Sequence, residues 1–222
     1  MKIKLWMDLN AAANASRYYK RAKELEEEAI KKRPKLKRPP KEWYEHFRWS
    51  FGNSGELILI GKNQEQNIRL VRKYAIGVHW LCHADIPGAA TVLLLGDRDL
   101  KEAAQLAGVF SSAWKRGYAA ADVYAFKKEQ INFSGPLMKG TYQIIGERQW
   151  FRNVPLGLKL ALDEKNRLNI YSLFSRREAF AEVYPGREKK ERVARELEKT
   201  LGIDPEDALA LLPEGLRLIW RI

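Results

Sequence analysis

The segment HWLCHADIPG, residues 79–88, combines side chains that often do chemistry in proteins. It holds two of the three histidines and the only cysteine, and an aspartate follows the second histidine by two residues. Imidazole, thiolate and carboxylate groups are the usual zinc ligands, and a histidine beside a carboxylate can act as a general acid or base. The segment could therefore hold a metal ion, contribute to catalysis, or form a strand anchored by polar groups.

The alternation of side chains along a strand separates these groups. If residues 79–86 are extended, His79, His83 and Asp85 share one face and Cys82 points to the other. His79 and His83 would then be roughly 13 Å apart, at about 3.3 Å per residue, which is too far for one metal ion. We therefore predict neither a metal site nor a cofactor, and we interpret His83 as hydrogen-bonded to Asp85 near the end of a strand.

An acid–base role for His83, with Asp85 as its orienting partner, is the alternative that an RNA-processing or RNA-modifying enzyme would require. No serine or lysine beside this pair presents itself as a nucleophile. We accordingly assign no catalytic residue and favour a non-catalytic protein.

The charge balance of the 222-residue chain points to a polyanionic partner. Forty Lys and Arg residues stand against 28 Asp and Glu residues, so the formal net charge is +12. RNA, DNA and an anionic membrane surface all attract such an excess. Because the sequence shows no signal-peptide core, no run of about 18 apolar residues and no lipidation signal, we expect a cytoplasmic protein with no membrane partner.

The N-terminal region should position part of this charge. Residues 8–32 are rich in Ala, Glu, Lys and Leu and lack Gly and Pro, which predicts a helix with Asp8 as its N-cap. The following KKRPKLKRPPK, residues 31–41, has seven basic residues among eleven and contains three prolines. We predict a stiff basic connector there and place residues 1–42 apart from a main domain of residues 43–222.

The main domain alternates strand and helix patterns without a strict βαβ rhythm. This indicates an α+β fold with a mixed, largely antiparallel sheet and packed helices, preceded by the N-terminal helix. The predicted strands cover residues 43–51, 56–61, 79–86, 90–95, 122–126, 140–146, 156–162, 168–174 and 215–222. The predicted helices cover residues 64–77, 99–117 and 187–202, with a short helix from Asp204 and with Gly117 at a C-cap.

Aromatic residues follow the basic connector in WYEHFRWSF, residues 43–51, with His46 and Arg48 between them. Aromatic rings can stack on unpaired bases while basic side chains neutralise phosphates, so this pattern suits single-stranded or looped RNA. Aromatic residues on alternate strand positions also pack into cores, and we expect at least half of these five rings to do so.

The candidate RNA-binding residues are basic, aromatic or placed at the strand end beside PGAA, residues 87–90. Arg69 and Arg72 are included because helical spacing would place them on one face. The complete set is Lys31, Lys32, Arg33, Lys35, Lys37, Arg38, Lys41, Trp43, Arg48, Trp49, Lys62, Arg69, Arg72, His83, Asp85, Lys115, Arg116 and Arg148.

Several separated motifs occur in an order that resembles a known family. They are WYEHFRW, LILIGKNQEQNIRLVRKY, HADIPGAATVLL, EAAQLAGVFSSAWKRG, DVYAF and KGTYQIIGERQWF. The order is similar to the NFACT-R RNA-binding domain at the C-terminal end of the RqcH and NEMF ribosome quality-control factors, here as a stand-alone, archaeal-type version. The resemblance implies binding of tRNA or ribosomal RNA in translation or ribosome-associated quality control.

The resemblance does not extend to the NFACT-N domain that full-length family members carry, so we expect no tailing of nascent chains by this chain alone. It implies the ribosome, or a separate NFACT-N-like protein, as a further partner. A protein adaptor that docks on the ribosome through the N-terminal helix is the remaining alternative. Within the domain, His79 stands where the family usually has Asp, and INFSGPLM, residues 131–138, replaces a Lys and an SGEYL-like stretch.

Overall fold

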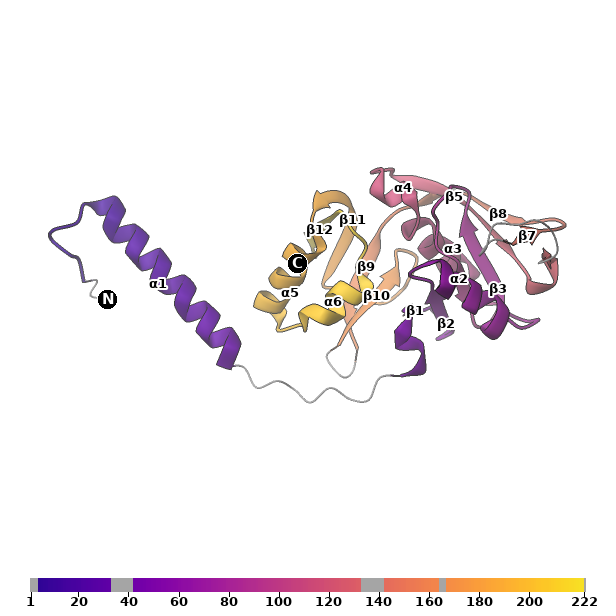
Figure 1. Cartoon of the computed structure of the whole chain (residues 1–222), viewed down its shortest axis with the longest axis horizontal. Coiled ribbons are helices and arrows are strands. Elements are labelled where there is room, and N and C mark those ends of the chain that lie inside the picture. The colour runs from indigo at the N-terminus through magenta and orange to yellow at the C-terminus, as the bar shows by residue number, and fades with distance from the viewer. Residues whose placement is uncertain (1–3, 33–41, 133–141, 164–166, 222) are drawn as a thin grey trace. The chain divides into compact units, whose positions relative to one another are not determined.

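The computed structural model describes residues 4–32, 42–132, 142–163 and 167–221. Internal contacts divide the chain into two compact units, Met1–Lys41 and Glu42–Ile222. The helix of the first unit is α1, Ala11–Lys32 (Figure 1). It begins later than predicted, because Asn10 rather than Asp8 caps it: Oδ1 of Asn10 accepts a hydrogen bond from the Ala13 backbone N–H at 2.8 Å.

The six-stranded sheet of the second unit is antiparallel throughout. Its strands in spatial order are β1 (Arg48–Phe51), β2 (Leu57–Ile60), β4 (Val92–Leu94), β3 (Trp80–Ala84), β5 (Ala120–Phe126) and β8 (Gln149–Pro155). A four-stranded antiparallel sheet contains β10 (Leu168–Ser172), β9 (Leu158–Leu162), β11 (Ala181–Glu188) and β12 (Leu216–Trp220). The strands β6 (Ile131–Asn132) and β7 (Gln143–Ile144) pair separately.

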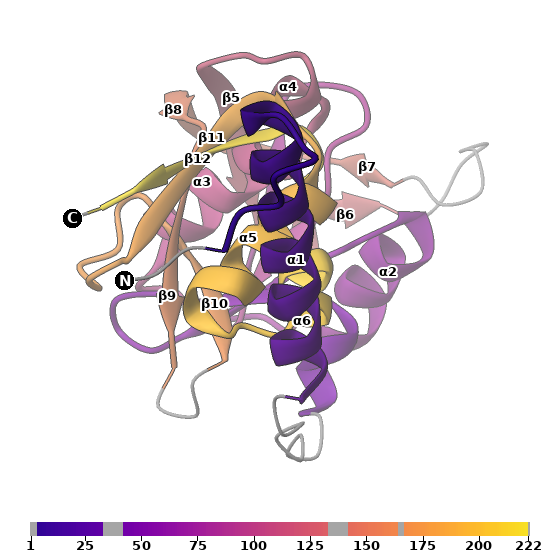
Figure 2. The same ribbon diagram turned by 90° about the vertical axis from the view of Figure 1, so that its left-hand side faces the viewer.

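The helices of this unit are short. They are the 3-10 helices η1 (Trp43–His46) and η3 (Lys128–Gln130), the π-helix η2 (Leu70–Tyr74), and the α-helices α2 (Gln64–Arg69), α3 (Leu100–Val109), α4 (Ser112–Lys115), α5 (Lys190–Leu201) and α6 (Pro205–Leu211). Helix α3 packs on the six-stranded sheet, and α5 and α6 lie side by side, with α6 against β10 (Figures 1 and 2). The predicted α+β class is confirmed.

A continuous core joins the two sheets. Oγ of Ser50 in β1 donates to the carbonyl of Ile170 in β10 at 2.7 Å, so the two sheets meet at these strands. Nε2 of Gln105 in α3 donates to the carbonyls of Pro155 (3.0 Å) and Gly157 (2.6 Å), which fixes the chain where β8 leads into β9. The contacts of Gln105 therefore hold α3 against the segment that joins the two sheets.

The structure corrects several predicted boundaries. Residues 43–46 form a 3-10 helix instead of the first part of a strand, and the strand begins at Arg48. The helix predicted for residues 99–117 is interrupted at Phe110, because Oγ of Ser111 accepts from the Ala113 N–H at 3.2 Å and starts α4. Gly117 ends α4 with a φ of 73°, as its predicted C-cap position requires.

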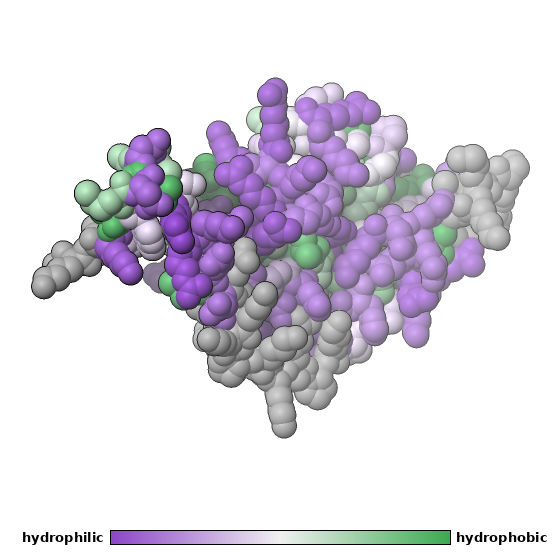
Figure 3. All heavy atoms as spheres, turned by 60° about the vertical axis from the view of Figure 1, so that its left-hand side comes forward, coloured by the Kyte–Doolittle hydropathy of each residue, from purple (hydrophilic) through white to green (hydrophobic). Residues whose placement is uncertain are grey.

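The strands β8 and β11 were not predicted, and the helix predicted from residue 187 begins at Lys190. In the part of the chain that the structure describes, no helix is both long and apolar enough to cross a membrane. Hydrophilic side chains cover most of the face shown in Figure 3, and hydrophobic ones appear there only in isolated places.

Candidate functional site

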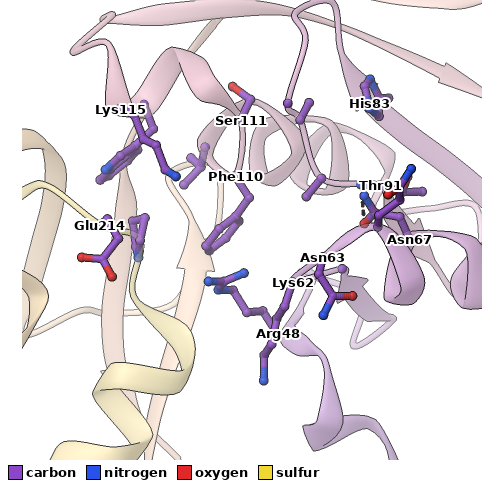
Figure 4. Close-up of a pocket in the computed structure, with 18 of the residues that line it drawn as sticks. Arg48, Lys62, Asn63, Asn67, His83, Thr91, Phe110, Ser111, Lys115 and Glu214 are labelled. Atoms are coloured by element: carbon purple, nitrogen blue, oxygen red, sulfur yellow. Dashed lines mark hydrogen bonds between the residues drawn. The ribbon is translucent and has the colours of Figure 1, made fainter. Parts of the chain in front are cut away.

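A groove of about 640 Å³ opens in the second unit (Figure 4). We call it the basic groove. Its lining comes from the loop that leads into α2, the loop between β3 and β4, the end of α3 with α4, and the chain before β12. These segments are residues 61–64, 88–91, 109–111, 114–115 and 213–214, together with Arg48, Asn67, His83, Tyr124, Tyr142, Ile144 and Lys190. The groove thus gathers four of the predicted site residues, Arg48, Lys62, His83 and Lys115, from distant parts of the sequence.

Arg48 is the most unusual residue of the groove. Its guanidinium carbon lies 5.1 Å from the centre of the Phe110 ring, and the two side chains face each other in Figure 4. The Nε atom of Arg48 is buried and has no hydrogen-bond partner among the described residues. Burial lowers the pKa of Arg48, and Glu214 partly opposes that shift. A desolvated cation without a direct partner costs free energy, which an anion bound in the groove would offset.

The other charges of the groove are also mostly positive. The lining contains four Lys and Arg residues, Arg48, Lys62, Lys115 and Lys190, and one carboxylate, that of Glu214. Nζ of Lys190 lies 2.7 Å from Oε1 of Glu214, so this carboxylate is already paired. The groove therefore presents a net positive surface to an incoming ligand.

Hydrogen bonds hold the floor of the groove in place. The backbone N–H of Thr91 donates to Oδ1 of Asn67 at 3.1 Å, and Oγ1 of Thr91 lies 3.0 Å from the hydroxyl of Tyr142. Gly61 makes room for this arrangement, because a Cβ there would lie 1.9 Å from Oδ1 of Asn67. The small residues Gly88, Ala89 and Ala90 add little side-chain volume to this part of the lining.

His83 forms part of the groove wall. Its Nδ1 lies 2.8 Å from the carbonyl oxygen of Ala84 and 3.3 Å from the hydroxyl of Tyr124. Burial is the main cause of a lowered pKa for His83. The residue is therefore neutral near pH 7 and supplies a polar contact rather than a charge.

The predicted hydrogen bond between His83 and Asp85 is wrong. The hydrogen-bond partners of His83 within the described residues are the backbone carbonyls of Ala84 and Ala89 and the hydroxyl of Tyr124. The physical reason is that β3 ends at Ala84, so the alternation that places both side chains on one face stops before Asp85. Asp85 is exposed, and its backbone N–H donates to Asp122 O at 2.8 Å. An acid–base pair of the two side chains therefore lacks the contact that it needs.

The remaining groups of HWLCHADIPG lie apart. Nδ1 of His79 lies 3.2 Å from the carbonyl of Tyr74, in the turn before β3. Cys82 is buried, and burial raises the pKa of its thiol. Over the described residues, no three His, Cys, Asp or Glu side chains lie close enough together to hold a metal ion.

The aromatic residues around β1 divide between core and surface. Trp49 is only 6% exposed and packs edge to face on Tyr44, with ring centres 5.2 Å apart. The prediction that Trp49 contacts RNA is therefore wrong, because its ring belongs to the core. Trp43 is 48% exposed and stacks on Tyr74 at 5.2 Å, so one face of its ring is already covered. RNA binding by Trp43 stays a prediction.

The other predicted basic residues lie outside the groove lining. Arg69 pairs with Glu65 at 3.0 Å. Arg72 lies in the π-helix η2, so the α-helical spacing that placed it on the same face as Arg69 does not apply. Arg116 is exposed after α4, and the Arg148 guanidinium carbon lies 4.7 Å from the centre of the Tyr124 ring. Lys31 and Lys32 fall in the last turn of α1, whereas Arg33, Lys35, Lys37, Arg38 and Lys41 lie outside the described residues.

Sequence reasoning missed Phe110 and Lys190 as groove residues. Phe110 was placed inside a continuous helix, although the pair Ser111–Ser112 after it is a typical helix-start signal. Lys190 had no local signal, because its place in the groove depends on the packing of α5 and its ion pair with Glu214.

Comparison with known families confirms the resemblance found in the sequence motifs. Residues 46–146 match the family described as NFACT protein RNA binding domain. The chain is 32% identical over 211 residues to the archaeal Rqc2 homolog aRqcH of Methanocaldococcus jannaschii, covering 86% of this chain and 31% of that protein. It is 26% identical over 174 residues to the ribosome quality control complex subunit NEMF homolog of Drosophila melanogaster, covering 73% of this chain and 16% of that protein.

The chain therefore spans less than a third of the length of these curated relatives. Among solved structures, the C-terminal part of the fibronectin/fibrinogen-binding protein from Streptococcus suis aligns with a TM-score of 0.43 and 26% identity, over 60% of this chain and 56% of that one.

Proposed function

Since residues 46–146 carry an NFACT RNA-binding domain, we propose that this chain binds RNA through the basic groove and takes part in translation or ribosome-associated quality control. Its relatives, an archaeal Rqc2 homolog and a homolog of a ribosome quality control complex subunit, support that setting. The RNA is tRNA or ribosomal RNA. The ribosome, or a separate protein that resembles the NFACT-N domain, is the proposed further partner.

The observation that carries the proposal is the partly buried guanidinium of Arg48, whose Nε has no hydrogen-bond partner among the described residues. A phosphate oxygen in the groove would accept hydrogen bonds from this group and would replace the water that burial removes. Phe110 supports the guanidinium from one side, so the charge is held in position before the ligand arrives. The groove thus offers a preorganised phosphate site rather than a loose patch of lysines.

Lys115 and Lys62 extend this site along the groove. A nucleic-acid strand carries one phosphate per nucleotide, so a bound strand needs several cations in sequence. The neutral His83 and the hydroxyl of Tyr124 provide hydrogen-bonding groups that can contact a sugar or a base edge. The basic residues between Lys31 and Lys41 add positive charge, which increases affinity for any RNA.

The test is binding of fluorescently labelled tRNA, and of a size-matched RNA of random sequence, over a titration of salt. The wild type is compared with the double variant Arg48→Met and Lys115→Met, and thermal unfolding verifies that the variant is folded. We expect tight tRNA binding by the wild type, with an affinity that falls steeply as salt rises, and a flatter dependence in the variant.

Dissociation constants weaker than about 10⁻⁴ M for both RNAs at physiological salt would contradict RNA binding as the function, because that is the weak limit of non-specific association. Tight binding that the double variant retains unchanged would contradict the groove as the site.

A further inference from the structure

Three rings lie side by side across three neighbouring strands. His83 in β3 is paired in register with Tyr124 in β5, and Tyr124 is paired with Trp150 in β8. The ring centres of His83 and Tyr124 are 5.8 Å apart, and those of Tyr124 and Trp150 are 5.3 Å apart. We call these three residues the aromatic row. Residues that pair directly across antiparallel strands project from the same face of a sheet, so the row forms one continuous strip.

The aromatic row lies on the sheet face opposite α3, where His83 and Tyr124 are half-buried. A Cβ on Gly108 of α3 would lie 3.5 Å from Cγ2 of Val123 and 3.9 Å from Cβ of Ala121, so these side chains face the helix. Tyr124 follows Val123 in β5 and therefore points to the opposite face. Trp150 is 38% exposed, which leaves part of a large ring open to solvent.

Two arginines flank the aromatic row. The guanidinium carbon of Arg148 lies 4.7 Å from the centre of the Tyr124 ring, and that of Arg152 lies 3.9 Å from the centre of the Trp150 ring. Nη1 of Arg152 is also 2.7 Å from Oδ2 of Asp122, which holds this guanidinium over the ring. Among the described residues, Arg148 has no carboxylate within ion-pair distance. Each of these two rings therefore has a guanidinium over one face, and the Arg148 guanidinium adds positive charge beside the row.

The aromatic row is continuous with the basic groove. His83 and Tyr124 belong to both, because they line the groove on one side and lead to Trp150 on the other. A strand whose phosphate lies near Arg48 could therefore continue over the row without leaving the positive surface.

We propose that the aromatic row stacks the unpaired bases of an RNA strand whose backbone enters the basic groove, so that the ligand class is single-stranded RNA or a single-stranded end of a folded RNA. This inference rests on the proposed function. Aromatic rings and guanidinium planes offer flat surfaces to any base, whereas the bases of a duplex are already stacked on one another. The charge of Arg148 complements the phosphates between the stacked bases.

The test uses three labelled RNAs of equal length: a single strand, a hairpin duplex, and the same single strand with successive abasic sites. Their dissociation constants are measured with the wild type, with Trp150→Ala and with the matched control Trp220→Ala. Trp220 suits this purpose because it is also a half-buried strand residue, but it lies in β12 of the other sheet. Urea unfolding of each variant verifies that the fold is retained.

We expect the wild type to bind the single strand roughly 5- to 100-fold more tightly than the abasic strand, and Trp150→Ala to lose most of that difference. The Trp220→Ala variant should keep it. If the wild type binds all three RNAs with equal, tight affinity and Trp150→Ala changes nothing, stacking on the row is overturned while RNA binding stands. If the wild type binds none of them, the proposed function fails and this inference fails with it.

Discussion

The guanidinium carbon of Arg48 and the ring centre of Phe110 lie 5.1 Å apart, and Nε of Arg48 lacks a hydrogen-bond partner among the described residues. The strand β1 supplies the arginine, and the end of α3 supplies the ring. This contact explains how a charge can be held at the floor of a groove without an acidic neighbour bound to it. Burial of this charge is a cost to folding that the Phe110 ring and the charge of Glu214 offset in part and that a bound anion would offset further.

Replacing Arg48 with methionine should lower the affinity for RNA without lowering the stability of the fold. Methionine keeps an unbranched side chain against Phe110 and removes the desolvated charge, so we expect the free energy of unfolding to stay equal or rise by up to about 2 kcal/mol. RNA affinity should fall roughly 10-fold or more, because a charge-assisted hydrogen bond to phosphate is lost. Urea unfolding and fluorescence anisotropy measure the two effects.

The matched control is Arg69→Met, since Arg69 is exposed and paired with Glu65 outside the groove lining. It should change RNA affinity less than Arg48→Met does. A large loss of stability in Arg48→Met with unchanged RNA affinity would show that the Arg48 charge serves the fold instead of a ligand.

The fold should tolerate glycine at position 153 but lose stability when Asn153 is replaced with valine. Its φ is 51°, and it is the one non-glycine residue with a positive φ in the described part of the chain. A β-branched residue is strained in this conformation, so we expect Asn153→Val to lower the free energy of unfolding by about 1–2 kcal/mol, whereas Asn153→Gly changes it by less than about 0.5 kcal/mol. Urea unfolding of both variants provides the measurement. Equal effects would mean that the backbone conformation does not limit this position.

The sequence predicted the fold class and most of the core strands because their patterns are local. Strands β2 and β4 are short apolar runs bounded by turn residues, and they could be identified without knowing their partners. The strand β8 was missed because its sequence QWFRNVP mixes exposed polar residues with rings, and its place in the sheet depends on pairing with β5. A strand whose place in the sheet depends on a partner far away in the sequence cannot be recognised from its own residues alone.

The residues of the candidate site were even harder to predict from local sequence patterns than strand β8. Arg48, Lys62 and Lys115 were selected for their charge alone, and only the folded chain places them around one groove. The pairing of His83 with Asp85 was inferred from strand alternation, which assumes that the strand continues past Ala84. The register that aligns His83, Tyr124 and Trp150 joins residues from three strands, so no local pattern contains it.

His83 should make the free energy of unfolding decrease as the pH falls. Burial lowers its pKa in the folded protein below the ordinary value of 6.5, so the unfolded chain binds the proton more readily between the two pKa values. The stability associated with neutral His83 is therefore complete above a pH of about 6.5 and is lost as the pH falls through the lowered folded pKa. The free energy of unfolding, measured from about pH 8 to 5, should fall less steeply in His83→Gln than in the wild type.

The exposed His46 provides the comparison, through the variant His46→Gln. If His83→Gln shows the same pH dependence as the wild type, or a steeper one at low pH, then the burial of His83 does not govern this part of the stability profile.

The connector and the basic groove should contribute differently to RNA binding. We expect replacement of the seven basic residues between Lys31 and Lys41 with glutamine to lower the affinity for tRNA and for random-sequence RNA by the same factor, because contacts with phosphates do not depend on RNA sequence. Replacing Lys62 and Lys115 in the groove with glutamine should weaken tRNA binding more than random-sequence binding, because those cations act from a fixed surface. Each lost phosphate contact should flatten the dependence of log affinity on log salt by about 0.7 to 0.9.

The salt titration of both variants, with the exposed Arg217→Gln as the control, measures this difference directly. A groove variant that weakens both RNAs equally would mean that the groove supplies charge and no discrimination. A connector variant that selectively weakens tRNA would place the discrimination in the connector. The two variants could flatten the dependence of log affinity on log salt equally and still differ in their selectivity for tRNA over random-sequence RNA. The segment whose variant loses that selectivity would then be the one that recognises the shape of the RNA.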